Sequence, residues 1–235
     1  ALKSPTRGST GGRGQHRLRQ VLIVGEVALA LVLLCGAAVM QRGFDQLIRK
    51  DLGWDTSHLL TGVLPMPEKR FPTPADRIEF YRKVLARLSI LPGAEAVTLT
   101  TSIPFWAYGS ERPIYTEKQD PAQKNDLPRA SHVMVAGDFF KTLGVPLREG
   151  RLFAPDLKPD DPKVIVINQA LALRLWPGES AIGKRLGSIN GATTTLSEVI
   201  GVVGNTEGGG AYDQGSPYQV FRPLAQEPWS WVRFA

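Results

Sequence analysis

The chain has 235 residues, of which 43% are hydrophobic and 21% are charged, a composition ordinary for a folded protein. Its net charge of +6 is concentrated in the first twenty residues, which carry five basic side chains and no acidic one, leaving 23 basic and 22 acidic residues elsewhere. A nucleic-acid-binding surface needs basic residues spread along folded elements, so we expect no nucleic acid partner. The five basic residues are Lys3, Arg7, Arg13, Arg17 and Arg19.

The segment 21–40 predicts one transmembrane helix. Its twenty residues, VLIVGEVALALVLLCGAAVM, contain a single charge. At about 1.5 Å of rise per residue, this length spans a hydrocarbon core of roughly 30 Å. A cleaved signal peptide would have a shorter apolar run of about 7 to 15 residues. A lipoprotein signal would need a small residue where Leu34 stands. We therefore favour a permanent anchor.

The distribution of basic residues predicts that the N-terminus is cytoplasmic. The tail 1–20 is basic, whereas the three basic residues that follow the helix are offset by Asp45 and Asp51. Everything beyond the helix is then extracytoplasmic. Apolar residues continue at helical spacing beyond the span, and Gly53 is a helix-stop signal, so we expect a short stalk helix over 41–54.

Glu26 is the candidate site residue of the membrane segment. An ionisable group within the bilayer costs a few kcal/mol if it faces lipid, so this side chain is expected to face another helix, stay protonated or reach toward the near interface. Two interpretations remain open. Glu26 is either a polar packing residue near the inner surface or a helix–helix contact that helps to transmit movement.

The first part of the outer domain predicts a β-α-β unit. Residues 58–65 have the composition of a strand, and Thr73 caps a helix that has Pro74 at its first position. This helix carries one apolar face, and the Pro-Gly pair 92–93 is expected to end it. Residues 94–101 then alternate like a second strand. The helix face consists of Ile78, Tyr81, Val84, Leu85, Leu88 and Leu91.

The rest of the outer domain, 55–235 as a whole, predicts an α+β fold with two β-α-β halves. A polar, proline-bearing region at about 104–128 separates the halves and reads as an inserted loop and strand lobe, with one possible strand at 112–116. The second half is expected to contain a strand at 131–135, a short helix from Asp138 closed by Gly144, a buried strand at 164–167, a helix at 169–175 capped by Asn168, and strands at 199–203, 218–221 and 229–234.

No motif in the sequence predicts catalysis, a metal or a cofactor. The glycine-rich stretch 201–210 matches neither dinucleotide-binding nor P-loop spacing, and Gly178-Glu179-Ser180-Ala181 lacks the glycine of a nucleophile elbow. Asp160 and Asp161 lie between prolines and predict a solvated turn. The lone Cys35 excludes an intrachain disulfide. The three histidines, His16, His58 and His132, have no partners at ligand spacing, so a zinc site is not expected.

Several stretches together resemble the MacB/FtsX-like ABC transporter permeases. The tail GSTGGRGQHRLRQ with VLIVGEVALALVLL is similar to the start of a permease half, in particular of the large duplicated orphan permeases of acidobacterial type. The outer chain resembles their MacB-type periplasmic core domain. It does so through FPTPADRIEFYRKVLARLSILPGAEAVTLTTSIPF, VAGDFFKTLGVPLREGRLF, VIVINQALALRLWPGESAIGKRLG, EVIGVVGNT and YQVFRPLAQEP.

The resemblance implies a non-catalytic permease subunit. In such a system an ABC ATPase on a separate chain drives movement that the stalk passes to a porter-like periplasmic domain, for efflux or mechanotransmission. The implied partners are the lipid bilayer, the ATPase, and a second copy or the other half of a duplicated permease. The chain starts without methionine, ends inside a predicted strand and lacks the family's further helices, so we expect a fragment of a longer permease.

Two other functions fit the same sequence features less well. The chain would be a membrane-tethered extracytoplasmic sensory or binding domain if one further helix led from it into a cytoplasmic signalling domain. It would be an anchored enzyme if its side chains formed a convergent catalytic site, and the sequence provides no such set.

Overall fold

The computed structural model describes residues 13–48, 53–55, 58–67, 69–103, 110–123, 125–206 and 216–235. The chain divides into two compact units, residues 1–50 and 51–235. Several parts of the predicted segments lie outside the described residues. These are 1–12 of the basic tail, 49–52 of the stalk, 104–109 and 124 of the insertion and 207–210 of the glycine-rich stretch.

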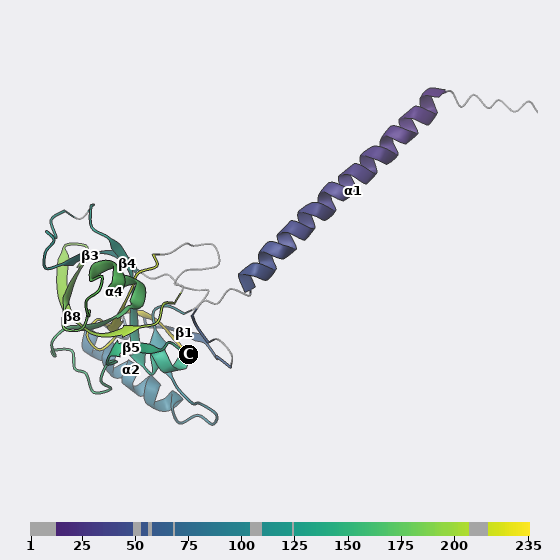
Figure 1. Cartoon of the computed structure of the whole chain (residues 1–235). Coiled ribbons are helices and arrows are strands. Elements are labelled where there is room, and N and C mark those ends of the chain that lie inside the picture. The colour runs from purple at the N-terminus through teal and green to yellow at the C-terminus, as the bar shows by residue number, and fades with distance from the viewer. Residues whose placement is uncertain are drawn as a thin grey trace, which may run out of the picture. The chain divides into compact units, whose positions relative to one another are not determined.

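The first unit contains α1 (Arg13–Ile48), a continuous helix of 36 residues (Figure 1). It includes the whole predicted span 21–40 and begins eight residues earlier, inside the predicted tail. Its described apolar side chains are exposed, and His16–Gln46 is long and apolar enough to cross a membrane. A helix satisfies its own backbone hydrogen bonds, which is why an apolar span of this length adopts this form in lipid.

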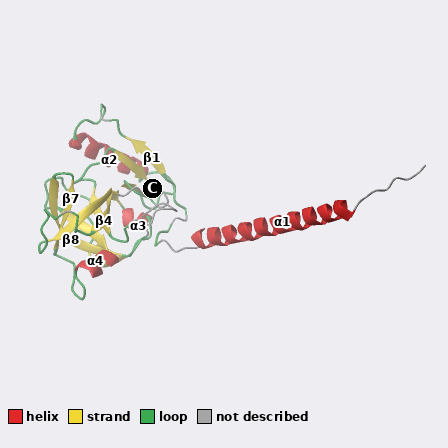
Figure 2. Cartoon of the chain, turned by 90° about the horizontal axis from the view of Figure 1, so that it is seen from above, coloured by secondary structure: helices red, strands yellow, loops and turns green. Residues whose placement is uncertain are grey.

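The second unit is an α+β domain, as the sequence predicts. Its described residues form one ten-stranded sheet and three helices. Figure 2 shows α2 and α4 at opposite ends of this unit, with strands between them. The elements are β1 (Gly62–Pro65), α2 (Pro74–Leu88), β2 (Thr98–Thr100), β3 (Ser110–Thr116), β4 (Arg129–Gly137), α3 (Phe139–Thr142), β5 (Leu147–Gly150), β6 (Val164–Asn168), α4 (Gln169–Leu175), β7 (Arg185–Asn190), β8 (Thr193–Val203), β9 (Gln219–Pro223) and β10 (Trp231–Phe234).

The N-terminal part of the domain is a β-α-β unit with a third strand between its two strands. β10 pairs antiparallel with both β1 and β2, so β1 and β2 run parallel on either side of it and α2 connects them. Tyr81 of α2 packs with Leu99 of β2 and Val232 of β10 in one buried cluster. The strand that completes this unit therefore comes from the far end of the sequence.

The predicted start of α2 agrees with the structure. Thr73 Oγ1 accepts a hydrogen bond from the Asp76 amide at 3.2 Å, and the Asp76 carboxylate accepts one from the Thr73 amide at 3.0 Å. This is a reciprocal capping box. The predicted end was too late, because the helix stops at Leu88 and Leu91 is 52% exposed rather than on the buried face.

Six strands of the sheet close into a barrel. The pairings run from β4 to β3, β7, β8, β6 and β9, and β9 pairs again with β4. A closed ring leaves no free edge among these six strands. β3 comes from the predicted insertion and pairs with both β4 and β7, so it is an integral strand of the barrel.

The sequence patterns did not predict three of the strand segments. β5, β7 and the first half of β8 lie where no strand was predicted, and β7 together with β8 forms a hairpin whose turn contains Gly191. β1 and β2 are shorter than predicted, because their pairing extends only from Gly62 to Pro65 and from Thr98 to Thr100. The helix cap of α4 agrees with the prediction, since Asn168 Oδ1 accepts from the Leu171 amide at 3.2 Å.

The barrel interior contains an apolar cluster to which all six strands contribute. Its members lie on the faces that point inward, and Leu171 of α4 packs among them. A second cluster lies around three phenylalanines, Phe139, Phe140 and Phe221, between the barrel and α3. The strand residues of the interior cluster are Ile114, Ala130, Ile165, Ile167, Leu186, Val199, Val202 and Val220.

Candidate functional site at the polar end of the barrel

Buried polar side chains occupy one end of the barrel. On five strands, a buried polar residue stands two positions before or after a residue of the apolar interior cluster. The pairs are Ile114 and Arg112, Ala130 and His132, Leu186 and Ser188, Val199 and Ser197, and Val220 and Arg222. Residues two apart on a strand share a face, so the polar members also point inward.

The polar members lie toward the same end of the barrel. The step from the apolar to the polar residue runs toward the N-terminus on β3 and β8 and toward the C-terminus on β4, β7 and β9. β3 runs antiparallel to β4 and β7, β8 runs antiparallel to β7, and β9 runs parallel to β4. The steps from apolar to polar residue therefore all point in one direction in space. On the sixth strand, the corresponding position is Lys163, which stands two residues before Ile165, just precedes β6 and is exposed. The barrel is therefore apolar in one part and cationic at one end.

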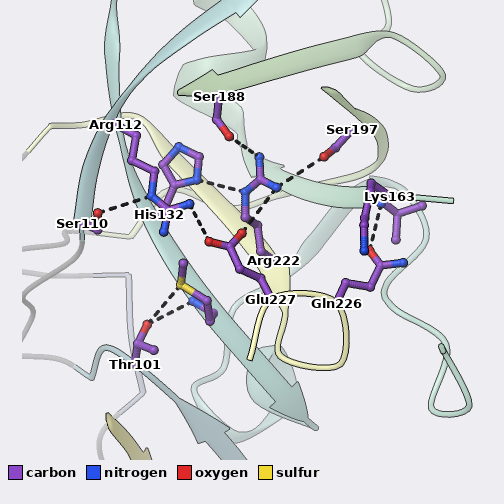
Figure 3. A network of polar contacts seen from close by, with 12 residues as sticks. Thr101, Ser110, Arg112, His132, Lys163, Ser188, Ser197, Arg222, Gln226 and Glu227 are labelled. Carbon is purple, nitrogen blue, oxygen red and sulfur yellow. Dashed lines mark hydrogen bonds and ion pairs between the residues drawn. The ribbon is translucent and has the colours of Figure 1, made fainter. Parts of the chain in front are cut away.

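Arg222 is the centre of this polar network (Figure 3). Its Nε donates to His132 Nδ1 at 3.0 Å, its Nη2 to Ser188 Oγ at 2.7 Å and its Nη1 to Ser197 Oγ at 3.3 Å. The residue is only 4% exposed. A planar guanidinium with donors in a fixed fork can bridge strands in this way, whereas a lysine ammonium cannot reach three separate acceptors in one plane.

Glu227 joins a second buried arginine to the first. Its Oε1 accepts from Arg112 Nη1 at 2.6 Å, and its Oε2 lies 3.6 Å from Arg222 Nη1. Arg112 is 4% exposed, and its Nε also donates to Ser110 Oγ at 3.3 Å. Figure 3 shows both guanidinium groups directed toward this one carboxylate, which follows β9 in the chain. Two buried cations thus share a single, partly exposed anion.

Two buried nitrogens of this network have no hydrogen-bond partner within the described part of the chain: Arg112 Nη2 and His132 Nε2. Both are donors in this arrangement. An Arg guanidinium has only donors, and His132 accepts at Nδ1, so its Nε2 carries the proton. An unsatisfied buried donor costs about 1 to 3 kcal/mol, so the network would gain from an additional acceptor.

Burial and the neighbouring cations keep His132 neutral. Desolvation, followed by the positive charges of Arg222 and Arg112, holds its pKa well below the usual value of 6.5. Desolvation also lowers the pKa of Arg222, to about 10, although Glu227 opposes this effect. Arg222 therefore keeps its charge at neutral pH, and His132 serves as an uncharged acceptor that orients it.

A cavity of about 230 Å³ opens beside the network. Both buried arginines line it, together with Glu227, Gln226 and Lys163. The β7–β8 hairpin adds the side chains of Asn190, Thr193 and Thr195 to its wall. The cavity is therefore surrounded by groups that donate hydrogen bonds and by more positive than negative charge.

The predicted site residue lies elsewhere. Glu26 is on α1 in the first unit, where its side chain is exposed, whereas the polar network belongs to the second unit. Asp161 forms the predicted turn, since its carboxylate accepts from the Lys158 amide at 2.8 Å. Ser180 donates to Glu149, and the described residues contain no cluster of potential metal ligands.

The sequence analysis missed the network, although it contained a signal. A charged residue inside a strand pattern, at a position in phase with buried apolar residues, predicts a buried charge with a partner. Arg222 in YQVFRPL and Arg112 in ERPIYT both satisfy this description. Two partners of Arg222 could not be inferred, because Ser188 and Ser197 belong to strand segments that were not predicted.

The apolar helix and the outer unit define a membrane-anchored α+β protein with an N-terminal membrane-spanning helix. The chain belongs to the family of the MacB-like periplasmic core domain, which matches residues 22–234 and so includes most of α1 as well as the outer unit. This match confirms the resemblance to ABC transporter permeases seen in the sequence. No curated protein matches the chain.

Three solved structures are similar to the chain. The periplasmic region of MacB from Actinobacillus actinomycetemcomitans is 16% identical, with a TM-score of 0.48 over 80% of this chain and 78% of that one. A permease-protein domain from Porphyromonas gingivalis is 18% identical, with a TM-score of 0.41 over 63% and 64%. The extracellular domain of the ABC-type transporter YknZ from Gram-positive bacteria is 14% identical, with a TM-score of 0.45 over 75% and 83%. With identities this low, the family assignment rests on the match to residues 22–234.

Proposed function

We propose that this chain is part of an ABC transporter permease in which α1 passes movement to the periplasmic domain. The movement is driven by a cytoplasmic ATPase on a separate chain and serves efflux or mechanotransmission. The main support is that one family match includes both the membrane helix and the outer unit, residues 22–234. The continuous helix α1 also supports this role, because a rigid rod transmits displacement over its length better than a flexible linker.

The proposed orientation follows from the basic tail. Its five cations favour a cytoplasmic N-terminus, which places the outer unit in the periplasm of a bacterial inner-membrane protein. A second copy of the chain, or the other half of a duplicated permease, would supply helices beside α1. Glu26 is then a polar contact to such a helix, and contacts of this kind contribute about 0.6 to 1.7 kcal/mol in membranes.

The coupling role can be tested without knowing the cargo. The intact permease, with Cys35→Ser and a fluorophore on Glu179→Cys, is reconstituted with its ATPase, and the ATP-induced change in fluorescence reports movement of the outer unit. Gln41→Gly with Asp45→Gly softens the predicted stalk, since glycine costs about 1 kcal/mol per position relative to alanine in a helix. We expect this double variant to lose most of the signal. Glu26→Leu should reduce it, and Glu26→Gln should retain more of it.

The matched control is Gln41→Ala with Asp45→Ala, which removes the same side chains and keeps the helix. If the glycine and alanine pairs respond alike, and Glu26→Leu equals the unsubstituted protein, α1 does not couple the ATPase to the outer unit. If ATP changes the fluorescence of neither the variants nor the unsubstituted protein, a tethered sensory or binding domain is favoured.

A further inference from the structure

We propose that the cationic end of the barrel is a binding site for a small anion, a ligand with a carboxylate or phosphate group held by Arg112 and Arg222. Anion binding at this site is separate from the proposed permease function, which does not require it. It is formed entirely by side chains of the outer unit, and it lies at the cavity of about 230 Å³ between the barrel end and the β7–β8 hairpin.

The charge of the cavity favours an anion. Among the described residues that line it are three cationic side chains, Arg112, Arg222 and Lys163, and one carboxylate, Glu227. Both arginines are 4% exposed, so water screens them little. Buried cations normally have an anionic partner each, and among the described residues Glu227 alone serves both arginines. A bound anion would supply the missing negative charge.

The hydrogen-bond donors also point to an anion. Arg112 lines the cavity, and its Nη2 has no partner within the described part of the chain. An arginine fork binds carboxylate and phosphate oxygens through two parallel bonds. The unpartnered Nη2 of Arg112 is itself buried, and its Nη1 is bonded to Glu227, so a ligand would reach this fork by displacing that carboxylate. Thr193 and Thr195 on the cavity wall provide hydroxyl groups for the remaining oxygens.

Glu227 shows what kind of group the arginines accept. Its carboxylate lies between the two guanidinium groups, 2.6 Å from Arg112 Nη1 and 3.6 Å from Arg222 Nη1. It follows β9 rather than being part of the barrel wall, and its side chain is 27% exposed. We infer that Glu227 occupies part of the position of the ligand and that an incoming anion competes with it for the arginines.

His132 and the two serines have a positioning role. His132, Ser188 and Ser197 fix the Arg222 guanidinium through its three nitrogens, and none of the three lines the cavity. They hold the fork in place before a ligand arrives, which lowers the entropic cost of binding.

The test uses the full chain in detergent and two probes, inorganic phosphate and acetate, each titrated against chloride at constant ionic strength. Binding is measured by calorimetry and by the shift in unfolding temperature. We expect saturable binding of at least one probe. Glu227→Gln removes the competing carboxylate and should tighten binding about tenfold, whereas Arg112→Gln should abolish it. Preference for phosphate or acetate identifies the ligand group.

Lys163→Gln provides a variant that keeps the buried network intact, in case Arg112→Gln fails to fold. It should weaken binding severalfold, because Lys163 is an exposed cation at the rim. The matched control is Lys184→Gln, a surface lysine whose side chain is 43% exposed and outside the cavity, and its affinity should be unchanged. Absence of saturable binding in both the unsubstituted chain and Glu227→Gln would overturn the proposal. Equal affinity in Arg112→Gln or Lys163→Gln would do the same. The permease function would be unaffected by either result.

Discussion

His132 shows how one buried residue depends on its surroundings. Its Nδ1 accepts from Arg222, and the nearest charged groups that shift its pKa are Arg222 and Arg112, both positive. A protonated imidazole would lose the hydrogen bond and add a third charge to a cationic site. The residue can therefore serve as an acceptor only while it is neutral, which makes the stability of the barrel end dependent on pH.

We predict that His132 makes the outer unit less stable in mild acid. Its folded-state pKa is depressed below the usual 6.5, so the unfolded chain binds a proton there more readily. The resulting stability is fully present above pH 6.5 and is lost as pH falls below it. Denaturant unfolding between pH 5 and 8 should show this loss in the unsubstituted chain, with a smaller pH dependence in His132→Gln.

The exposed His58 is the control for this measurement. It has a positive φ of 62°, so His58→Asn is the suitable change, because asparagine tolerates that conformation. This variant should keep the full pH dependence of the unsubstituted chain. An unchanged pH dependence in His132→Gln would show that His132 does not contribute to the acid sensitivity.

At the scale of elements, the starts of α2 and α4 were predicted better than the strands. Thr73 and Asn168 predict helix starts from local chemistry, because the side-chain oxygen of each accepts a hydrogen bond from the amide three residues later. Strand pairing has no such local signal. β10 lies between β1 and β2, and β9 closes the barrel against β4, through contacts between residues far apart in the sequence.

The strands that were missed share a polar composition. β7 reads RLGSIN and the start of β8 reads TTTLSE, so the buried positions of these segments include Ser188 and Ser197 beside a few apolar side chains such as Leu186. These serines are buried because they accept hydrogen bonds from Arg222. A pattern of hydrophobic alternation cannot identify a strand whose inward face is partly polar. The same cause hid both the strands and the candidate site.

The cap of α2 gives a prediction at this scale. Thr73→Ala removes the acceptor for the Asp76 amide and one side of the capping box, so the outer unit should lose about 0.5 to 2 kcal/mol of stability. The midpoint of denaturant unfolding measures the loss. Thr73→Ser keeps the hydroxyl oxygen and should retain most of the stability. Equal losses in the alanine and serine variants would show that the hydroxyl is not the source of the effect.

The whole molecule combines two units with opposite solvent requirements. The described apolar side chains of α1 are exposed along its span, whereas the outer unit buries its own apolar clusters around and within a barrel. A helix with so much exposed apolar surface requires a lipid environment, while the core of the outer unit needs none. The family match, residues 22–234, includes most of α1 together with the outer unit. The membrane helix is therefore a feature that the chain shares with its family.

The single cysteine makes the proposed orientation testable. In a Cys35→Ser background, Glu179→Cys places a thiol on the outer unit, where the native side chain is 63% exposed, and Thr10→Cys places one in the basic tail. A maleimide that does not cross the inner membrane is added to cells with a permeabilised outer membrane. We expect it to label Glu179→Cys in these cells and to label Thr10→Cys only after the inner membrane is opened, because the tail's cations favour the cytoplasmic side. Both variants should react equally in denatured lysate, which controls for expression.

Labelling of Thr10→Cys but not of Glu179→Cys in cells with an intact inner membrane would contradict the orientation. Protection of both thiols would place the outer unit in the cytoplasm, and a periplasmic role for the cationic barrel end would then be impossible.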